Sequence, residues 1–177
     1  MGGENLSMKY SDKAKESAIK DVSIKALKGS IIAVIGENGA GKTTLFSLLA
    51  GARSPNSGKL YHSKPKGSIR VASVSALSLP PSFCSTSLYS KIMRLCHSIP
   101  LEEVKLFENI SQHFFRRKVP QSSILKSLEY ALKLCPDVLL LDEAISPETK
   151  DELSFFLRSR EVRKQIQLAT LVATHDL

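Results

Sequence analysis

The sequence lacks any apolar run long enough to cross a membrane as a helix. Such a helix needs about 18 consecutive apolar residues, whereas the longest candidates, 31–35 and 138–141, have the length of buried strands. The segment Met1–Asn5 contains no basic region followed by an apolar one, so we expect no secretory signal.

Cysteine is also scarce, since no two of the three form a CxxC pair: Cys84, Cys96 and Cys135. An odd count without such a pair is typical of a reducing compartment, and we expect a cytoplasmic protein. The chain has 177 residues, of which 42% are hydrophobic and 24% charged. These values exclude a disordered chain and a disulfide scaffold, and they predict a single domain spanning 1–177.

The chain has fewer acidic than basic residues, with 17 Asp and Glu against 25 Lys and Arg, which gives a net charge of +8. Such an excess attracts phosphates, nucleic acid or an anionic membrane surface, but a solvated basic surface explains it equally well. The densest basic cluster, 116–118, is short, and no nucleic-acid-binding motif accompanies it. We therefore expect no nucleic-acid partner.

Short apolar segments alternate with helical patterns along most of the chain. Residues 21–27 alternate apolar and polar, which predicts a half-buried strand, and the continuous run 30–35 predicts a fully buried central strand. Further strands are expected at 59–62, 68–74, 137–141 and 168–174, and helices at 43–50 and 147–163. This alternation predicts an α/β fold with a parallel sheet.

The period becomes helical between about residue 85 and residue 135. One helix face carries Leu88, Ile92 and Leu95, a second carries Val104, Phe107 and Ile110, and a third runs from Ile124 to Cys135. We expect a small helical lobe inserted between strands of the sheet.

A glycine-rich loop follows the strand at 30–35 and matches G-x-x-x-x-G-K-[ST]. The residues are Gly36, Glu37, Asn38, Gly39, Ala40, Gly41, Lys42, Thr43 and Thr44. Glycines let the backbone wrap around a phosphate with its N–H groups inward, and the next helix presents its positive end to the same anion. Lys42 is expected to reach the β- and γ-phosphates of a nucleotide, and the Thr43 hydroxyl to ligate Mg²⁺.

Two carboxylates end the apolar strand at 137–141. Such a strand end lies where α/β proteins bind ligands. We expect Asp142 to help hold Mg²⁺ and Glu143 to act as general base toward an attacking water. A simple acidic pair capping the strand is the alternative.

Three motifs, GENGAGKTT, LLLDE and LVATHD, together resemble the nucleotide-binding domain of ATP-binding cassette (ABC) proteins. The resemblance covers nearly the whole chain. It implies a P-loop NTPase fold of ABC type, mainly parallel with an N-terminal antiparallel portion. It also implies ATP and Mg²⁺ as cofactors, a head-to-tail dimer, and membrane-embedded transporter subunits as partners at the cytoplasmic face. Tyr10 matches the aromatic residue that stacks on adenine, or it is an ordinary strand aromatic. His175 matches the histidine that contacts the γ-phosphate.

The sequence departs from that family at its signature loop. No glycine follows Gly67, so the Ser-Gly-Gly-Gln-like element is missing, and 119–122 occupies its place. Pro120 has no N–H to offer a partner's nucleotide. Ser122 and Ser123 lie at a helix N-terminus, where they either replace part of the signature or cap the helix.

Other departures affect coupling and chain length. The family's glutamine loop has no counterpart, because no glutamine lies between Lys42 and Gln112. After Glu143, only Ser146 is shared with the family's usual turn. The family normally continues beyond the residues after His175, which predicts a truncated domain.

Weak signature elements and a short helical lobe resemble the ATP-binding subunits of bacterial capsule and O-antigen polysaccharide exporters. The sequence therefore predicts an ABC-type ATPase driving a transporter, with polysaccharide export as the finer expectation. The alternatives are a non-transport ABC ATPase acting on DNA and a degenerate module that binds ATP with little hydrolysis.

Overall fold

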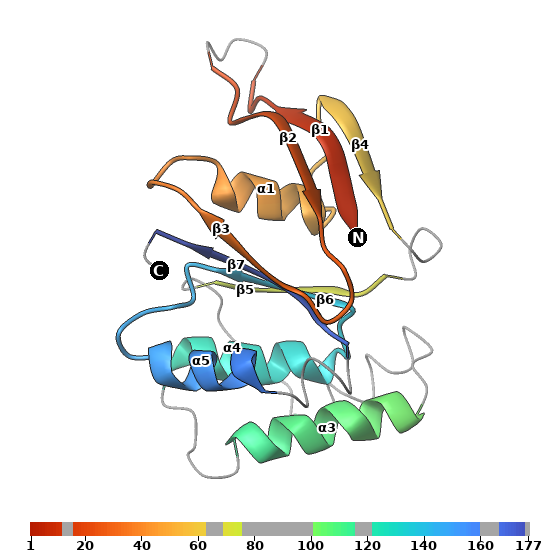
Figure 1. Cartoon of the computed structure of the whole chain (residues 1–177), viewed down its shortest axis with the longest axis vertical. Helices are drawn as coiled ribbons and strands as arrows, with labels where there is room; N and C mark the ends of the chain where they lie inside the picture. The colour runs from red at the N-terminus through yellow and green to blue at the C-terminus, as the bar shows by residue number, and fades with distance from the viewer. Residues whose placement is uncertain (12–15, 63–68, 76–100, 116–121, 160–166, 176–177) are drawn as a thin grey trace.

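The computed structural model describes residues 1–11, 16–62, 69–75, 101–115, 122–159 and 167–175, which form two sheets with helices between and below them (Figure 1). The antiparallel sheet contains β1 (Gly2–Met8), β2 (Ile19–Lys25) and β4 (Ser57–Tyr61) in the order β2-β1-β4. The parallel sheet contains β3 (Ile31–Ile35), β5 (Val71–Ser75), β6 (Val138–Asp142) and β7 (Ala169–Thr174) in the order β3-β7-β6-β5. The expected α/β fold with an antiparallel N-terminal portion is confirmed.

Helices cover both faces of the parallel sheet. Helix α1 (Lys42–Leu49) lies between the two sheets, whereas α4 (Ser123–Lys133) and α5 (Lys150–Arg158) lie on the opposite face, and α3 (Leu101–Phe115) lies below α4 (Figure 1). None of the helices among the described residues is long and apolar enough to cross a membrane.

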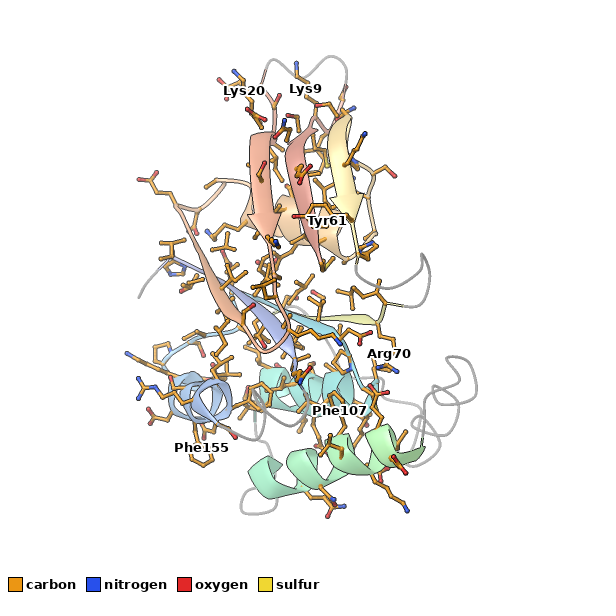
Figure 2. The ribbon with its side chains drawn as sticks, turned by 45° about the vertical axis from the view of Figure 1, so that its right-hand side comes forward. Lys9, Lys20, Tyr61, Arg70, Phe107 and Phe155 are labelled. Carbon is orange, nitrogen blue, oxygen red and sulfur yellow. The ribbon has the colours of Figure 1, made fainter. Side chains whose placement is uncertain are left out.

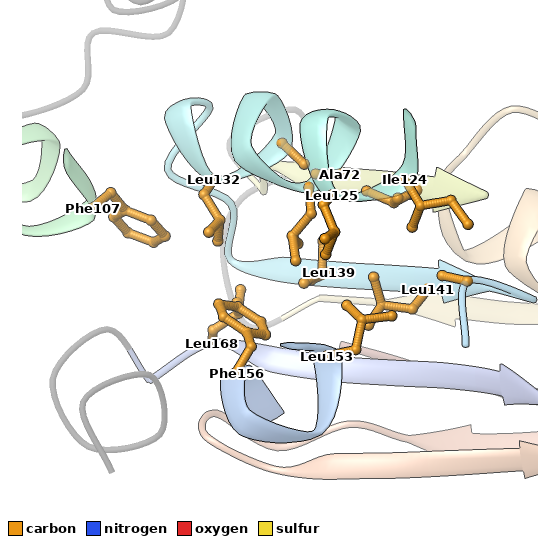
Figure 3. Close-up of a cluster of buried hydrophobic side chains, with 14 of the residues drawn as sticks. Ala72, Phe107, Ile124, Leu125, Leu132, Leu139, Leu141, Leu153, Phe156 and Leu168 are labelled. Carbon is orange, nitrogen blue, oxygen red and sulfur yellow. The ribbon is translucent and has the colours of Figure 1, made fainter. Parts of the chain in front are cut away.

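Strand β6 forms the centre of the core, since all five of its residues are buried. Leu139 and Leu141 pack with the helices α4 and α5, as Figure 3 shows. Val138 and Leu140 point to the other face and pack in the cluster that contains α1. Burying each such leucine contributes about 1.5–3 kcal/mol. This alternation fixes the register of β6 and therefore the position of the two carboxylates at its end.

Arg70 links the sheet to the helical lobe (Figure 2). Its guanidinium forms an ion pair with Glu103 of α3 and lies 3.6 Å from Asp137 Oδ1, while its backbone N–H donates to Asp137 Oδ2 at 3.0 Å. Val104 and Phe107 of α3 are buried, as their helical spacing predicted. The expected helix through Leu88, Ile92 and Leu95 lies outside the described residues.

The expectation that 30–35 is a fully buried central strand is wrong. Among the described strands, β3 pairs only with β7, so it lies at the edge of the sheet. Alternate side chains of β3 are exposed to solvent, with Ile31 41% and Ile35 53% exposed. A run of apolar β-branched residues is compatible with an edge strand as well as a central one, so composition alone did not decide its place.

Several element boundaries also differ from expectation, two of them for a reason visible in the contacts. The helix expected at 147–163 begins only at Lys150, because the hydroxyl of Thr149 accepts the Ser146 N–H and donates to the Ala144 carbonyl, which fixes a turn instead. The strand expected at 21–27 runs two residues earlier, as β2, because it pairs with β1 over Ile19–Lys25.

Candidate functional site

The glycine loop joins β3 to α1 in a conformation that needs glycine. Gly39 and Gly41 have φ values of 83° and 90°, in the left-handed region. A side chain at Gly41 would also collide with the carbonyl oxygen of Ala18. The loop therefore has the backbone geometry in which successive N–H groups converge on an anion at the start of a helix.

Lys42 is the first residue of α1 and is buried, with 7% of its surface exposed. Its Nζ donates to the carbonyl oxygens of Gly36 at 2.8 Å and Glu37 at 3.0 Å. The same Nζ lies 3.8 Å from Oε1 of Glu143. The fold thus brings the glycine loop and the acidic strand end together.

Asp142 and Glu143 point into different surroundings. Asp142 is 8% exposed, and its Oδ1 has no hydrogen-bond partner among the described residues. The Glu143 side chain is 46% exposed, and its backbone, at φ 51°, donates an N–H to the Ala173 carbonyl at 3.1 Å. A buried carboxylate oxygen with spare acceptor capacity fits the oxygen ligands and coordinated waters that Mg²⁺ prefers.

His175 directly follows β7, the strand that lies between the glycine-loop strand β3 and the acidic strand β6. Strand β7 lies between β3 and β6, with Thr174 opposite Ile35 and Ala173 opposite Asp142. The exposed His175 therefore lies at the same edge of the sheet as Lys42 and Glu143.

A cavity of about 230 Å³ lies in front of the loop. Tyr10 contributes to it, and its hydroxyl lies 2.7 Å from Oγ1 of Thr44. Its lining is formed by Tyr10, Ala18, Gly39, Gly41, Lys42, Thr43, Thr44 and Glu143. The structure thus brings together Tyr10, which follows β1, residues of the loop and of α1, and Glu143, which follows β6. The other residues expected at the site are not part of this lining: Gly36, Glu37, Asn38, Ala40, Asp142 and His175.

Sequence reasoning missed Arg53, whose guanidinium carbon lies 4.9 Å from the centre of the Tyr10 ring. No motif marks this arginine, which follows α1 in a turn, and only the fold brings it to Tyr10. Residues 119–122 occupy the place of the family's signature loop, and Ser122 is the one of them that the structure describes. Its hydroxyl accepts the N–H groups of Ile124 at 3.2 Å and Leu125 at 3.5 Å. Ser122 therefore caps α4, and 119–121 lies outside the described residues.

The chain resembles known proteins over most of its length. A family model described as "ABC transporter" matches residues 19–81. An ABC transporter ATP-binding protein of Methanosarcina mazei is 31% identical, over 98% of this chain and 67% of the relative. The zinc import ATP-binding protein ZnuC of Buchnera aphidicola is 27% identical, over 91% of this chain and 69% of the relative.

Solved structures show the same fold. The ATP-binding subunit of an ABC transporter superimposes with a TM-score of 0.73 at 18% identity, covering 99% of this chain and 79% of that one. A bacterial ABC transporter cassette, solved as a dimer, gives a TM-score of 0.73 at 16% identity, covering 99% and 88%.

Proposed function

The chain belongs to the family of ABC transporter ATP-binding proteins, and on that premise we propose that it binds Mg·ATP and hydrolyses the β–γ bond to drive a membrane transporter. The observation that carries the proposal is the 3.8 Å separation between Lys42 Nζ and Glu143 Oε1 at one cavity. A phosphate-binding cation and a base for water are then within reach of the same phosphoryl group.

The loop residues bind and orient the nucleotide in this proposal. Lys42 and the loop N–H groups hold the β- and γ-phosphates, and Tyr10 provides an aromatic surface in the lining of the same cavity. Thr43 and Asp142 hold Mg²⁺, which supplies charge neutralisation at the phosphates. The orphaned Oδ1 of Asp142 supports this assignment, because a buried carboxylate oxygen needs a partner.

Glu143 accepts a proton from the attacking water, and His175 supports the geometry of that water. The partial exposure of Glu143 at the cavity leaves room for a water beside its carboxylate. Glu143 also occupies a left-handed backbone conformation, which is uncommon for a non-glycine residue and which functional sites often retain.

A head-to-tail pair of such chains, attached to membrane-embedded subunits at the cytoplasmic face, is the proposed assembly. Among the relatives, the Buchnera aphidicola protein is a zinc import ATP-binding protein, and a Fusobacterium nucleatum protein at 24% identity is a spermidine/putrescine import ATP-binding protein. The polysaccharide export expected from the weak signature finds no support among them, and the proposal does not include it.

A second candidate is a module that binds ATP with little hydrolysis. The missing glycine signature favours it, because Pro120, in the place of that signature, has no N–H to offer a partner's nucleotide. The DNA-acting alternative has only the net charge of +8 in its favour.

Phosphate release by the purified chain, measured with ATP in the presence of Mg²⁺ or EDTA, tests these functions. The proposal expects slow release that requires Mg²⁺. Tight ATP binding without any release, even with the transporter subunits present, would favour the non-hydrolysing module. DNA binding that weakens steeply with added salt would favour the DNA-acting alternative.

A further inference from the structure

The Tyr10 ring is fixed by two contacts from the region of α1. Its hydroxyl lies 2.7 Å from Oγ1 of Thr44, within the helix, and the Arg53 guanidinium carbon lies 4.9 Å from the ring centre, beyond the helix end. Tyr10 is nevertheless 59% exposed. An aromatic side chain that is largely exposed yet held at both its edge and its face is ordered without being buried.

Of the three residues in contact, Tyr10, Thr44 and Arg53, only the first two line the cavity. Tyr10 and Thr44 line the 230 Å³ cavity with the glycine loop, whereas Arg53 is not among its lining residues. We propose that Arg53 is a positioning residue that backs the Tyr10 ring, so that the other ring face is presented as a stacking surface for the base of the bound nucleotide. This inference rests on the proposed ATP-binding function and extends it to a residue with no place in the glycine loop.

Two physical effects support this role. A guanidinium over one face of an aromatic ring is attracted to its electrons and withdraws density from the opposite face. An electron-rich base that approaches that opposite face then meets less repulsion. In addition, a ring that is already held in place loses less conformational freedom when a base stacks on it.

The contact predicts selectivity of a particular kind. Stacking is tolerant of base identity because every base has a π-face. Arg53 should therefore strengthen the binding of a nucleoside triphosphate over that of a polyphosphate without a base, and it should leave the phosphate contacts of Lys42 unchanged.

The test compares ATP with inorganic tripolyphosphate, each with Mg²⁺, by titration calorimetry on the full chain. For R53Q we expect ATP affinity to fall about two- to fivefold, with tripolyphosphate affinity unchanged. The control K59Q removes the same charge from an exposed position on β4, and it should leave both affinities unchanged.

A double-mutant comparison separates positioning from a general charge effect. Y10A should weaken ATP binding at least about fivefold, and adding R53Q to Y10A should cause no further loss. Unchanged or tighter ATP binding by R53Q, an equal loss of tripolyphosphate binding, or additive losses in the double variant would each overturn the inference. If the wild-type chain binds neither ligand, the proposed function itself fails, which is a distinguishable result.

Discussion

Nζ of Lys42 lies 3.8 Å from Oε1 of Glu143, and this pair joins the first helix of the fold to the end of β6. The two side chains differ in exposure, at 6% for Lys42 and 46% for Glu143. A pair with one half-exposed partner contributes little to stability, about 1 kcal/mol or less. Its significance is positional, because it sets a cation and a carboxylate at the same cavity.

Replacing Lys42 by alanine should abolish ATP binding. Lys42 is the cation of the glycine loop, and without it the β- and γ-phosphates lose two charge-assisted hydrogen bonds of about 1.5 kcal/mol each, or at least about 100-fold in affinity. Titration with a fluorescent ATP analogue measures the loss, and K59A serves as the charge-matched control. Unchanged affinity in K42A would show that the loop does not bind phosphate.

Replacing Glu143 by glutamine should leave ATP binding intact and remove hydrolysis. The carboxamide keeps the shape of the side chain but cannot accept the proton of the attacking water. Phosphate release at saturating Mg·ATP measures this effect, with E148Q as an exposed acidic control on the turn before α5. If two chains associate at all, E143Q should also hold them together in the presence of ATP. Release at the wild-type rate would contradict the role of Glu143.

The isolated chain should be mostly monomeric with Mg·ATP and should hydrolyse ATP slowly. No glycine follows Gly67, and Pro120 in the place of the signature has no N–H, so few preorganised donors remain for a partner's γ-phosphate. Each such donor contributes about 10²–10³ in rate. Light scattering beside a phosphate-release assay measures both properties. An ATP-dependent homodimer turning over faster than about 1 s⁻¹ would show that Ser122 and Ser123 replace the signature.

Cys135 should resist alkylation while the chain is folded. Burial raises the pKa of its thiol from 9.0 to about 12, with the Glu103 carboxylate adding to the shift. At pH 8 the thiolate fraction is then about 10³-fold lower than in the unfolded chain. Mass spectrometry after iodoacetamide treatment, with and without denaturant, measures the difference.

The same shift has a consequence for stability. Because the folded-state pKa lies above the unfolded value, the contribution of Cys135 is complete below pH 9 and is lost as the pH rises from 9 toward 12. C135S should therefore show a weaker loss of stability over that alkaline range. Equal labelling rates in the folded and unfolded chain would contradict both expectations.

Local sequence patterns were sufficient to predict the phosphate loop and most of the strands and helices around it. The loop is a local motif, since the left-handed backbone at Gly39 and Gly41 and the position of Lys42 are settled within a few residues. The apolar face of α4 and the buried strand β6 were likewise predictable, because burial on one helix face leaves a helical period and burial on both strand faces leaves a continuous apolar run.

Strand order and the contacts between distant residues have no signal in the local sequence. The order β3-β7-β6-β5 leaves β3 paired on one side among the described strands, although its composition is that of a central strand. The same order brings Lys42 to Glu143, and the packing of β1 beside α1 brings Arg53 over Tyr10. These contacts join residues that are distant along the chain, and they depend on which strands pair and which faces pack, so their geometry exists only once the core has formed.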